Sequence, residues 1–140
     1  MRNGIVEDLM ICNGQFYNQI NNYSVLFEDD GYVAYAYILN ELDEIVGDVW
    51  LYNSQLTPKN PEWHNPEKQM PFANSFEFVE DIRFEPVTNI KDVSVKWINE
   101  NKVKVYVYIR NELFAVLTKG SKPGKSLLTK KNGPLSKVLK

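Results

Sequence analysis

The chain has 140 residues, of which 44% are hydrophobic and 24% charged, and its formal net charge is −2. This length and composition are typical of one soluble globular domain spanning residues 1–140. The first residues are not a secretory signal, because Glu7 and Asp8 interrupt the apolar stretch that a signal requires. No apolar run is long enough to cross a bilayer, and the single Cys12 excludes an internal disulfide. We therefore expect a cytoplasmic protein.

Residues 1–22 form an N-terminal segment whose secondary structure the sequence leaves open. Ile5, Leu9 and Cys12 fit one face of a helix loosely, but Gly14 and the asparagine-rich stretch at 18–22 break that pattern. A short helix and a short strand are both compatible with this segment.

The chain contains two similar strings of residues about 70 positions apart. Residues 23–41 read YSVLFEDDGYVAYAYILNE, and residues 93–112 read VSVKWINENKVKVYVYIRNE. Each string pairs two β-forming runs across a turn, and a further apolar run follows each of them. The repeat predicts two similar three-stranded antiparallel meanders, at 23–53 and 76–118. Convergence of two strand pairs on common β-forming residues is the alternative to a true repeat.

Alternation along the predicted strands indicates which side chains face the core. In residues 103–110 one set is entirely β-branched, whereas the other carries Lys104 and Arg110 and must meet water. Mapping this assignment through the repeat places Ala34, Ala36 and Ile38 inward. In residues 45–52 the odd positions are apolar or small and are predicted to face the core. The predicted outward residues are Tyr35, Tyr37, Asp48, Trp50, Tyr52, Tyr106 and Tyr108.

Residues 54–75 form a long proline-rich loop between the two meanders. Its four prolines cannot donate to a sheet ladder, so this segment is not a central strand. Loops of this length are functional or pack over the body of the domain, and Trp63, Met70 and Phe72 favour packing. Residues 76–84 fit a strand or a short helix. A helical turn is expected at 89–92, with Asn89 or Thr88 as its cap.

Charge is divided unevenly along the chain. Residues 1–118 hold all 18 acidic residues and nine basic ones, giving −9, whereas residues 119–140 hold seven lysines and no acid, giving +7. We expect the lysine-rich segment to dock on the acidic body or stay solvated, with an interaction tail as the alternative. The acidic body repels a phosphate backbone, so nucleic acid is not an expected partner. Short elements, at 126–129 and 135–139, complete the chain.

Together these patterns predict a mainly β protein, with an α+β protein as the alternative. The two meanders are expected to form one twisted sheet, a sandwich or a partly open barrel, with the proline-rich loop between them.

No catalytic apparatus is recognisable. Residues 120–126 resemble a phosphate-binding loop, but only three residues separate the two glycines, and Pro123 removes an amide donor. His64 is the only histidine, so a multi-histidine zinc site is excluded, and nothing indicates that it meets Cys12. We expect no catalytic residues, no metal and no cofactor. Asp48 is unusual because it lies in mid-strand, where it contacts either a ligand or the covering loop.

Several strings resemble those of small uncharacterised bacterial proteins. The most specific is GDVWLYN at 47–53, and residues 33–38, 61–63, 71–74 and 133–135 contribute as well. Those proteins are similar in size and character to the immunity proteins that neutralise bacterial toxins. The resemblance therefore implies a toxin-neutralising binding protein.

The outward aromatic residues are the main functional prediction, because large exposed aromatic patches mark interaction sites. Coverage of these residues by the proline-rich loop and the N-terminus is the alternative. We expect a non-catalytic protein-binding module, most concretely an immunity-type inhibitor of a basic toxin domain, that does not bind membranes. A small-molecule-binding or enzymatic domain with a pocket near Asp48 and Trp50, and a homo-oligomerising structural protein, in the simplest case a homodimer, are the alternatives. The candidate contact residues are Tyr35, Tyr37, Asp48, Trp50, Tyr52, Trp63, His64, Tyr106 and Tyr108.

Overall fold

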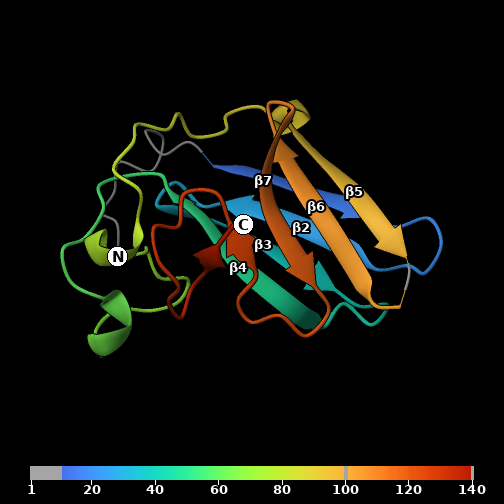
Figure 1. Ribbon diagram of the computed structural model, residues 1–140, viewed down its shortest axis with the longest axis horizontal. Coiled ribbons are helices and arrows are strands. Elements are labelled where there is room, and N and C mark those ends of the chain that lie inside the picture. The colour runs from blue at the N-terminus through green and yellow to red at the C-terminus, as the bar shows by residue number, and fades with distance from the viewer. Residues whose placement is uncertain (1–10, 100, 140) are drawn as a thin grey trace.

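Two β-sheets account for most of the regular structure in the computed structural model, which describes residues 11–99 and 101–139 (Figure 1). The first sheet has the order β1-β2-β3-β4, all antiparallel, with β1 at Cys12–Tyr17, β2 at Ser24–Asp29, β3 at Val33–Leu39 and β4 at Ile45–Asn53. The described part of the N-terminal segment thus includes a strand. The expectation for residues 1–10 lies outside the described residues.

The second sheet has the order β5-β6-β7-β8-β9. Its strands are β5 at Val93–Asn99, β6 at Val103–Ile109, β7 at Glu112–Thr118, β8 at Lys125–Ser126 and β9 at Lys137–Val138. All pairs are antiparallel except β8 with β9. The prediction of a mainly β protein with two antiparallel meanders is confirmed, and neither sheet closes into a barrel.

Three short 3-10 helices lie between the sheets in sequence: η2 at Glu62–His64, η3 at Phe76–Phe78 and η4 at Ile90–Asp92. The predicted helical turn at 89–92 is confirmed, and its cap is Asn89, whose side chain accepts a hydrogen bond from the backbone N–H of Lys91 at 3.0 Å. In Figure 1 the proline-rich loop gathers at one end of the two sheets.

The two sheets lie one in front of the other (Figure 1), and one hydrophobic cluster joins them. The predicted inward residues Ala34, Ala36 and Ile38 are fully buried, which confirms the alternation read from the second copy. The second sheet contributes Val105 and Val107, which alternate along β6, and Ala115 and Leu117, which alternate along β7. Phe114 is buried as well, at the register shift between these two strands.

The C-terminal segment covers the edge of β4. The backbone N–H of Asp48 donates to Ser121 at 3.0 Å, that of Gly124 donates to Asp48 at 2.7 Å, and that of Trp50 donates to Leu135 at 3.0 Å. The fit is close, because a Cβ on Gly124 would lie 2.6 Å from the carbonyl oxygen of Val116. The lysine-rich segment therefore packs on the body, and β4 is paired along both of its sides.

An irregularity in β4 changes the direction of Tyr52. Trp50 pairs with Tyr35 and Tyr52 pairs with Ala34, so Leu51 is an extra residue without a partner in β3. A bulge of this kind moves the following side chain to the other face. The prediction that Tyr52 faces outward is wrong: it lies on the core face and is 1% exposed.

Candidate functional site

The proline-rich loop covers one part of the outward aromatic face. Tyr35 and Trp50 lie on the outer side of the first sheet, as predicted, but they are only 6% and 0% exposed. The Tyr35 hydroxyl donates to the carbonyl oxygen of Phe72 at 2.7 Å. The Trp50 indole N–H donates to the Asn53 side chain at 2.9 Å, and Asn53 in turn bonds the backbone of Asn74. For these two residues the covering alternative is therefore correct.

Glu62 holds this loop in place. Its carboxylate is 5% exposed, accepts a hydrogen bond from the backbone N–H of Ala73 at 2.9 Å and accepts another from the Tyr32 hydroxyl. Lys68 lies 3.6 Å from the same carboxylate. A buried carboxylate is costly unless such donors surround it. Through these bonds Glu62 connects the middle of the loop to Ala73 near its end and to Tyr32, the residue before β3.

Tyr37 lies beyond the loop at the centre of an acidic surface. In the sheet register it sits between Leu26 and Asp48, and Glu28 lies across from its neighbour Tyr35. The rings of Tyr35 and Tyr37 stack, with centroids 5.8 Å apart. Burial, followed by the charges of Glu28, Asp48 and Asp30, raises the pKa of Tyr37 above its usual value. The ring therefore lies in a region of negative potential.

Asp48 completes this surface from β4. Its carboxylate is half-buried, and burial raises its pKa although Lys122 acts in the opposite direction. Within the part of the chain that the structure describes, its side chain accepts no hydrogen bond. Asp48 thus makes no side-chain hydrogen bond to the covering loop. Such a bond was one of its two predicted roles.

The same surface continues onto β1. The outward residues of β1 pair with those of β2 and are exposed; Tyr17 is 59% exposed. We call this surface the acidic face. It consists of Tyr17, Leu26, Glu28, Asp30, Tyr37 and Asp48.

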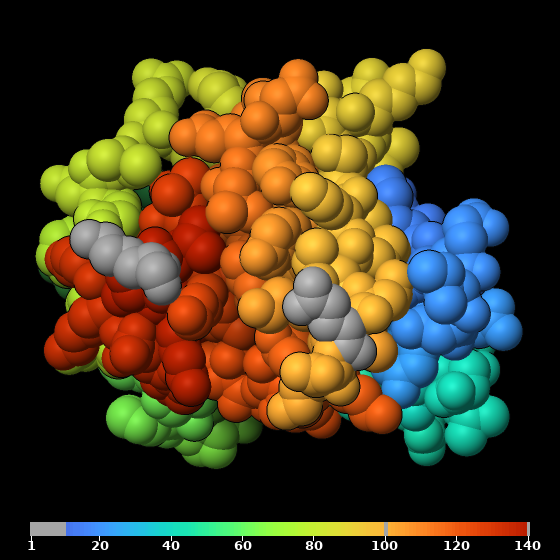
Figure 2. All heavy atoms as spheres, turned by 45° about the vertical axis from the view of Figure 1, so that its right-hand side comes forward, coloured from blue at the N-terminus to red at the C-terminus, as the bar shows by residue number. Residues whose placement is uncertain are grey.

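Tyr106 and Tyr108 lie on a different surface. They project from the outer side of the second sheet, where one cross-strand row runs through Lys96, Tyr106, Val116 and Lys125. Figure 2 shows this side, with β5 to β7 in gold and orange and the C-terminal segment in red. Lys104 lies two residues before Tyr106 on the same strand. We call this surface the lysine face, so the predicted tyrosines are divided between two faces whose charges have opposite sign.

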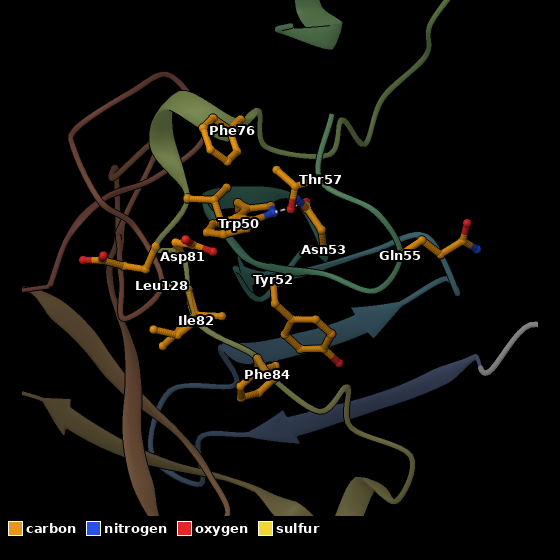
Figure 3. A pocket seen from close by; sticks show the side chains of 12 residues that line it. Trp50, Tyr52, Asn53, Gln55, Thr57, Phe76, Asp81, Ile82, Phe84 and Leu128 are labelled. Atoms are coloured by element: carbon orange, nitrogen blue, oxygen red, sulfur yellow. Dashed lines mark hydrogen bonds between the residues drawn. The ribbon is translucent and has the colours of Figure 1, made fainter. Parts of the chain in front are cut away.

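A cavity of about 390 Å³ lies where β4 ends (Figure 3). Trp50 and Tyr52 form its floor, and the Tyr52 hydroxyl points away from it to the buried carboxylate of Asp29, at 2.7 Å. Asp48 does not line this cavity. The predicted pocket near Asp48 and Trp50 therefore includes Trp50 alone.

Trp63 and His64 belong to η2 within the proline-rich loop. Trp63 packs edge-on to His64, with ring centroids 5.9 Å apart, and lies 5.8 Å from the ring of Phe78. His64 is exposed, and neither residue lines the cavity at Trp50.

Sequence reasoning missed Glu28 and Leu26 on the acidic face and Glu80 and Asp81 at the cavity. The alternation of β2 was available as a signal for the first pair, since Leu26 and Glu28 are two residues apart. The second pair lies in an irregular segment, where no period indicates which side chains converge.

The described residues contain no group of three histidine, cysteine, aspartate or glutamate side chains that is placed to hold a metal ion. Cys12 is buried, and burial together with Asp29 and Asp92 raises the pKa of its thiol. Within residues 11–99 and 101–139, no helix has the length and apolar character needed to cross a membrane.

No protein-family model, curated protein or solved structure matches the chain. The resemblance to small bacterial proteins stays a prediction.

Proposed function

We propose that this chain is a non-catalytic protein-binding module that holds a positively charged partner on its acidic face. The observation that supports this best is the position of Tyr37, which is half-buried among Glu28, Asp30 and Asp48 and stacked on Tyr35. A lysine or arginine of the partner would lie over the tyrosine ring and between the carboxylates.

Two physical effects favour a contact between a cation of the partner and Tyr37 with its neighbouring carboxylates. A cation over an aromatic ring is stabilised by about 0.5–2 kcal/mol, depending on how far the pair is desolvated. Asp48 is already partly desolvated in the free protein because it is half-buried, and this burial raises its pKa. Pairing it with a cation therefore gains attraction for a smaller additional desolvation cost than a fully hydrated carboxylate would require.

A groove of about 560 Å³ beside Asp30 extends the acidic surface along the proline-rich loop. Its lining includes Asp30, Glu62 and Glu67 but only one basic side chain, Lys68, which is paired with Glu62. A partner that is basic over a wide area would be steered to this side of the molecule and away from the lysine face.

The finer proposal is that the partner is a basic bacterial toxin domain and that this chain is its cytoplasmic immunity-type inhibitor. It follows from the predicted resemblance together with the acidic face. A purified partner whose toxic activity is blocked at equimolar amounts supports it. If a basic partner binds but keeps its activity, the proposal of a binding module stands and the proposal of an inhibitor is wrong.

The binding proposal is tested by purifying the partner on the immobilised chain from the native host and then measuring the purified pair. We expect a basic protein whose affinity falls as salt rises. Tyr37→Ala should weaken binding by roughly 30-fold, the effect of an interface hot spot. The matched control is Tyr108→Ala, on the lysine face, which should leave affinity unchanged. Equal losses from both variants, or an acidic partner, would contradict the proposal.

A further inference from the structure

We infer that the cavity at the end of β4 binds a small organic cation with a flat apolar body, such as an aromatic primary amine. This site is separate from the acidic face and does not depend on the proposed protein partner.

The cavity is formed by segments that are distant in sequence. Figure 3 shows Asp81, Ile82 and Phe84 along one side, Asn53, Gln55 and Thr57 along the other, and Phe76 at one end. Two backbone hydrogen bonds fix the first side to the C-terminal segment: Glu80 N–H donates to Leu128 at 2.8 Å, and Lys130 N–H donates to Phe78 at 2.7 Å. The walls are therefore held by the fold.

One part of the wall is apolar and partly uncovered. Phe76 is 59% exposed and Ile82 is 62% exposed, although both border a cavity of about 390 Å³. Phe84 continues the wall inward, where it packs on Tyr52 with ring centroids 4.9 Å apart. Cavities of a few hundred Å³ with aromatic walls and a few polar groups are typical ligand sites. A flat apolar body between Phe76, Ile82 and Phe84 would cover these exposed surfaces.

The polar lining selects a cation. Its two charged groups are the carboxylates of Glu80 and Asp81, and no basic side chain lines the cavity. Arg83, two residues after Asp81, lies 3.6 Å from Glu85 and is turned to that partner. The further acceptors of the lining are the side-chain oxygens of Gln55 and Thr57, because the Asn53 side-chain oxygen already accepts from the Trp50 indole and the Asn74 backbone. The Lys130 ammonium lies 5.2 Å from the Phe76 ring centroid and the Arg110 guanidinium carbon lies 5.5 Å from that of Phe84, so each of these rings already has a cation of the chain beside it.

The test compares three probes of the same shape: 2-phenylethylamine, which is cationic, 2-phenylethanol, which is neutral, and 3-phenylpropanoate, which is anionic. Amide chemical shifts of the intact chain are followed as each probe is added, up to about 10 mM, because a ligand of this size has an affinity near the millimolar range. We expect saturable shifts at Asn53, Asp81 and Ile82. The amine should bind at least roughly fivefold more tightly than the alcohol, and the anion more weakly than both.

Two variants separate the charge from the apolar wall. Asp81→Asn should remove most of the preference for the amine over the alcohol, whereas Phe76→Ala should weaken both by roughly tenfold. The control is Leu56→Ala, because Leu56 is 89% exposed and does not line the cavity. Absence of saturable shifts with any probe, equal binding of all three, or an Asp81→Asn variant with unchanged preference would overturn the inference.

Binding of the amine in the cavity does not depend on binding of the protein partner. Tyr37→Ala should leave amine binding unchanged, and Phe76→Ala should leave partner binding unchanged. A failure of one proposal is thereby distinguished from a failure of the other.

Discussion

At the scale of single residues, Asp48 connects the stability of the fold with its proposed use. Its carboxylate is half-buried, and the pKa is raised above the usual 3.8 mainly by burial. The native state therefore keeps a proton that the unfolded chain has already released. Stability is lost as pH rises from about 3.8 through the raised pKa, because the charged form is disfavoured only in the native state.

Asp48→Asn should consequently increase the free energy of unfolding at pH 7, and the gain should vanish below about pH 3, where both states are protonated. Urea unfolding at several pH values measures this difference. Glu41→Gln, at an exposed turn, is the control and should show no such gain. A destabilised Asp48→Asn at pH 7 would mean that the carboxylate has a stabilising partner in the free protein.

Tyr52 is a structural residue rather than a contact residue. Its hydroxyl donates to the buried Asp29 carboxylate at 2.7 Å and accepts from the backbone N–H of Val87 at 3.0 Å. Tyr52→Phe leaves an acceptor and a donor unpaired in the core, so we expect a loss of about 2–3 kcal/mol in unfolding free energy. Tyr35→Phe removes a single bond, to Phe72, and should cost about 1 kcal/mol. Equal losses from the two variants would show that the Asp29 network adds nothing.

At the scale of elements, the proline-rich loop depends on Glu62. Glu62→Ala removes the acceptor of the Ala73 N–H and of the Tyr32 hydroxyl, so hydrogen exchange at the Ala73 amide should accelerate by at least about tenfold. Glu67→Ala, in the same loop but exposed, should leave this rate unchanged. Unchanged protection in Glu62→Ala would show that packing alone holds the loop.

The strands were predictable where a strict alternation ran through them. Residues 103–109 alternate valine or isoleucine with lysine or tyrosine, and this pattern assigned the faces of both β6 and β3 correctly. The bulge at Leu51 was not predictable, because apolar and aromatic residues surround it on both faces. The pairing of β4 with the C-terminal segment was hidden as well, since it uses backbone groups at Ser121, Gly124 and Leu135 that leave no side-chain signal.

At the scale of the whole molecule, the two sheets distribute the charges differently from their order along the chain. The sequence shows an acidic part before residue 119 and a basic part after it. In the structure, Lys96 and Lys104 from the acidic part join Lys125 on the lysine face, whereas Glu28 and Asp48 both lie on the acidic face. This redistribution depends on long-range strand pairing, so composition alone could not locate the candidate site.

Under the proposed function, the acidic face and not the lysine face receives a cationic partner. The most direct measurement maps amide chemical-shift changes when a short peptide of alternating lysine and alanine is added at low salt. We predict saturable changes at Tyr17, Leu26, Glu28, Tyr37 and Asp48, which disappear in a chain carrying both Glu28→Gln and Asp48→Asn, and none at Tyr106 or Val116. Changes on the lysine face, or changes that persist in the double variant, would contradict the claim.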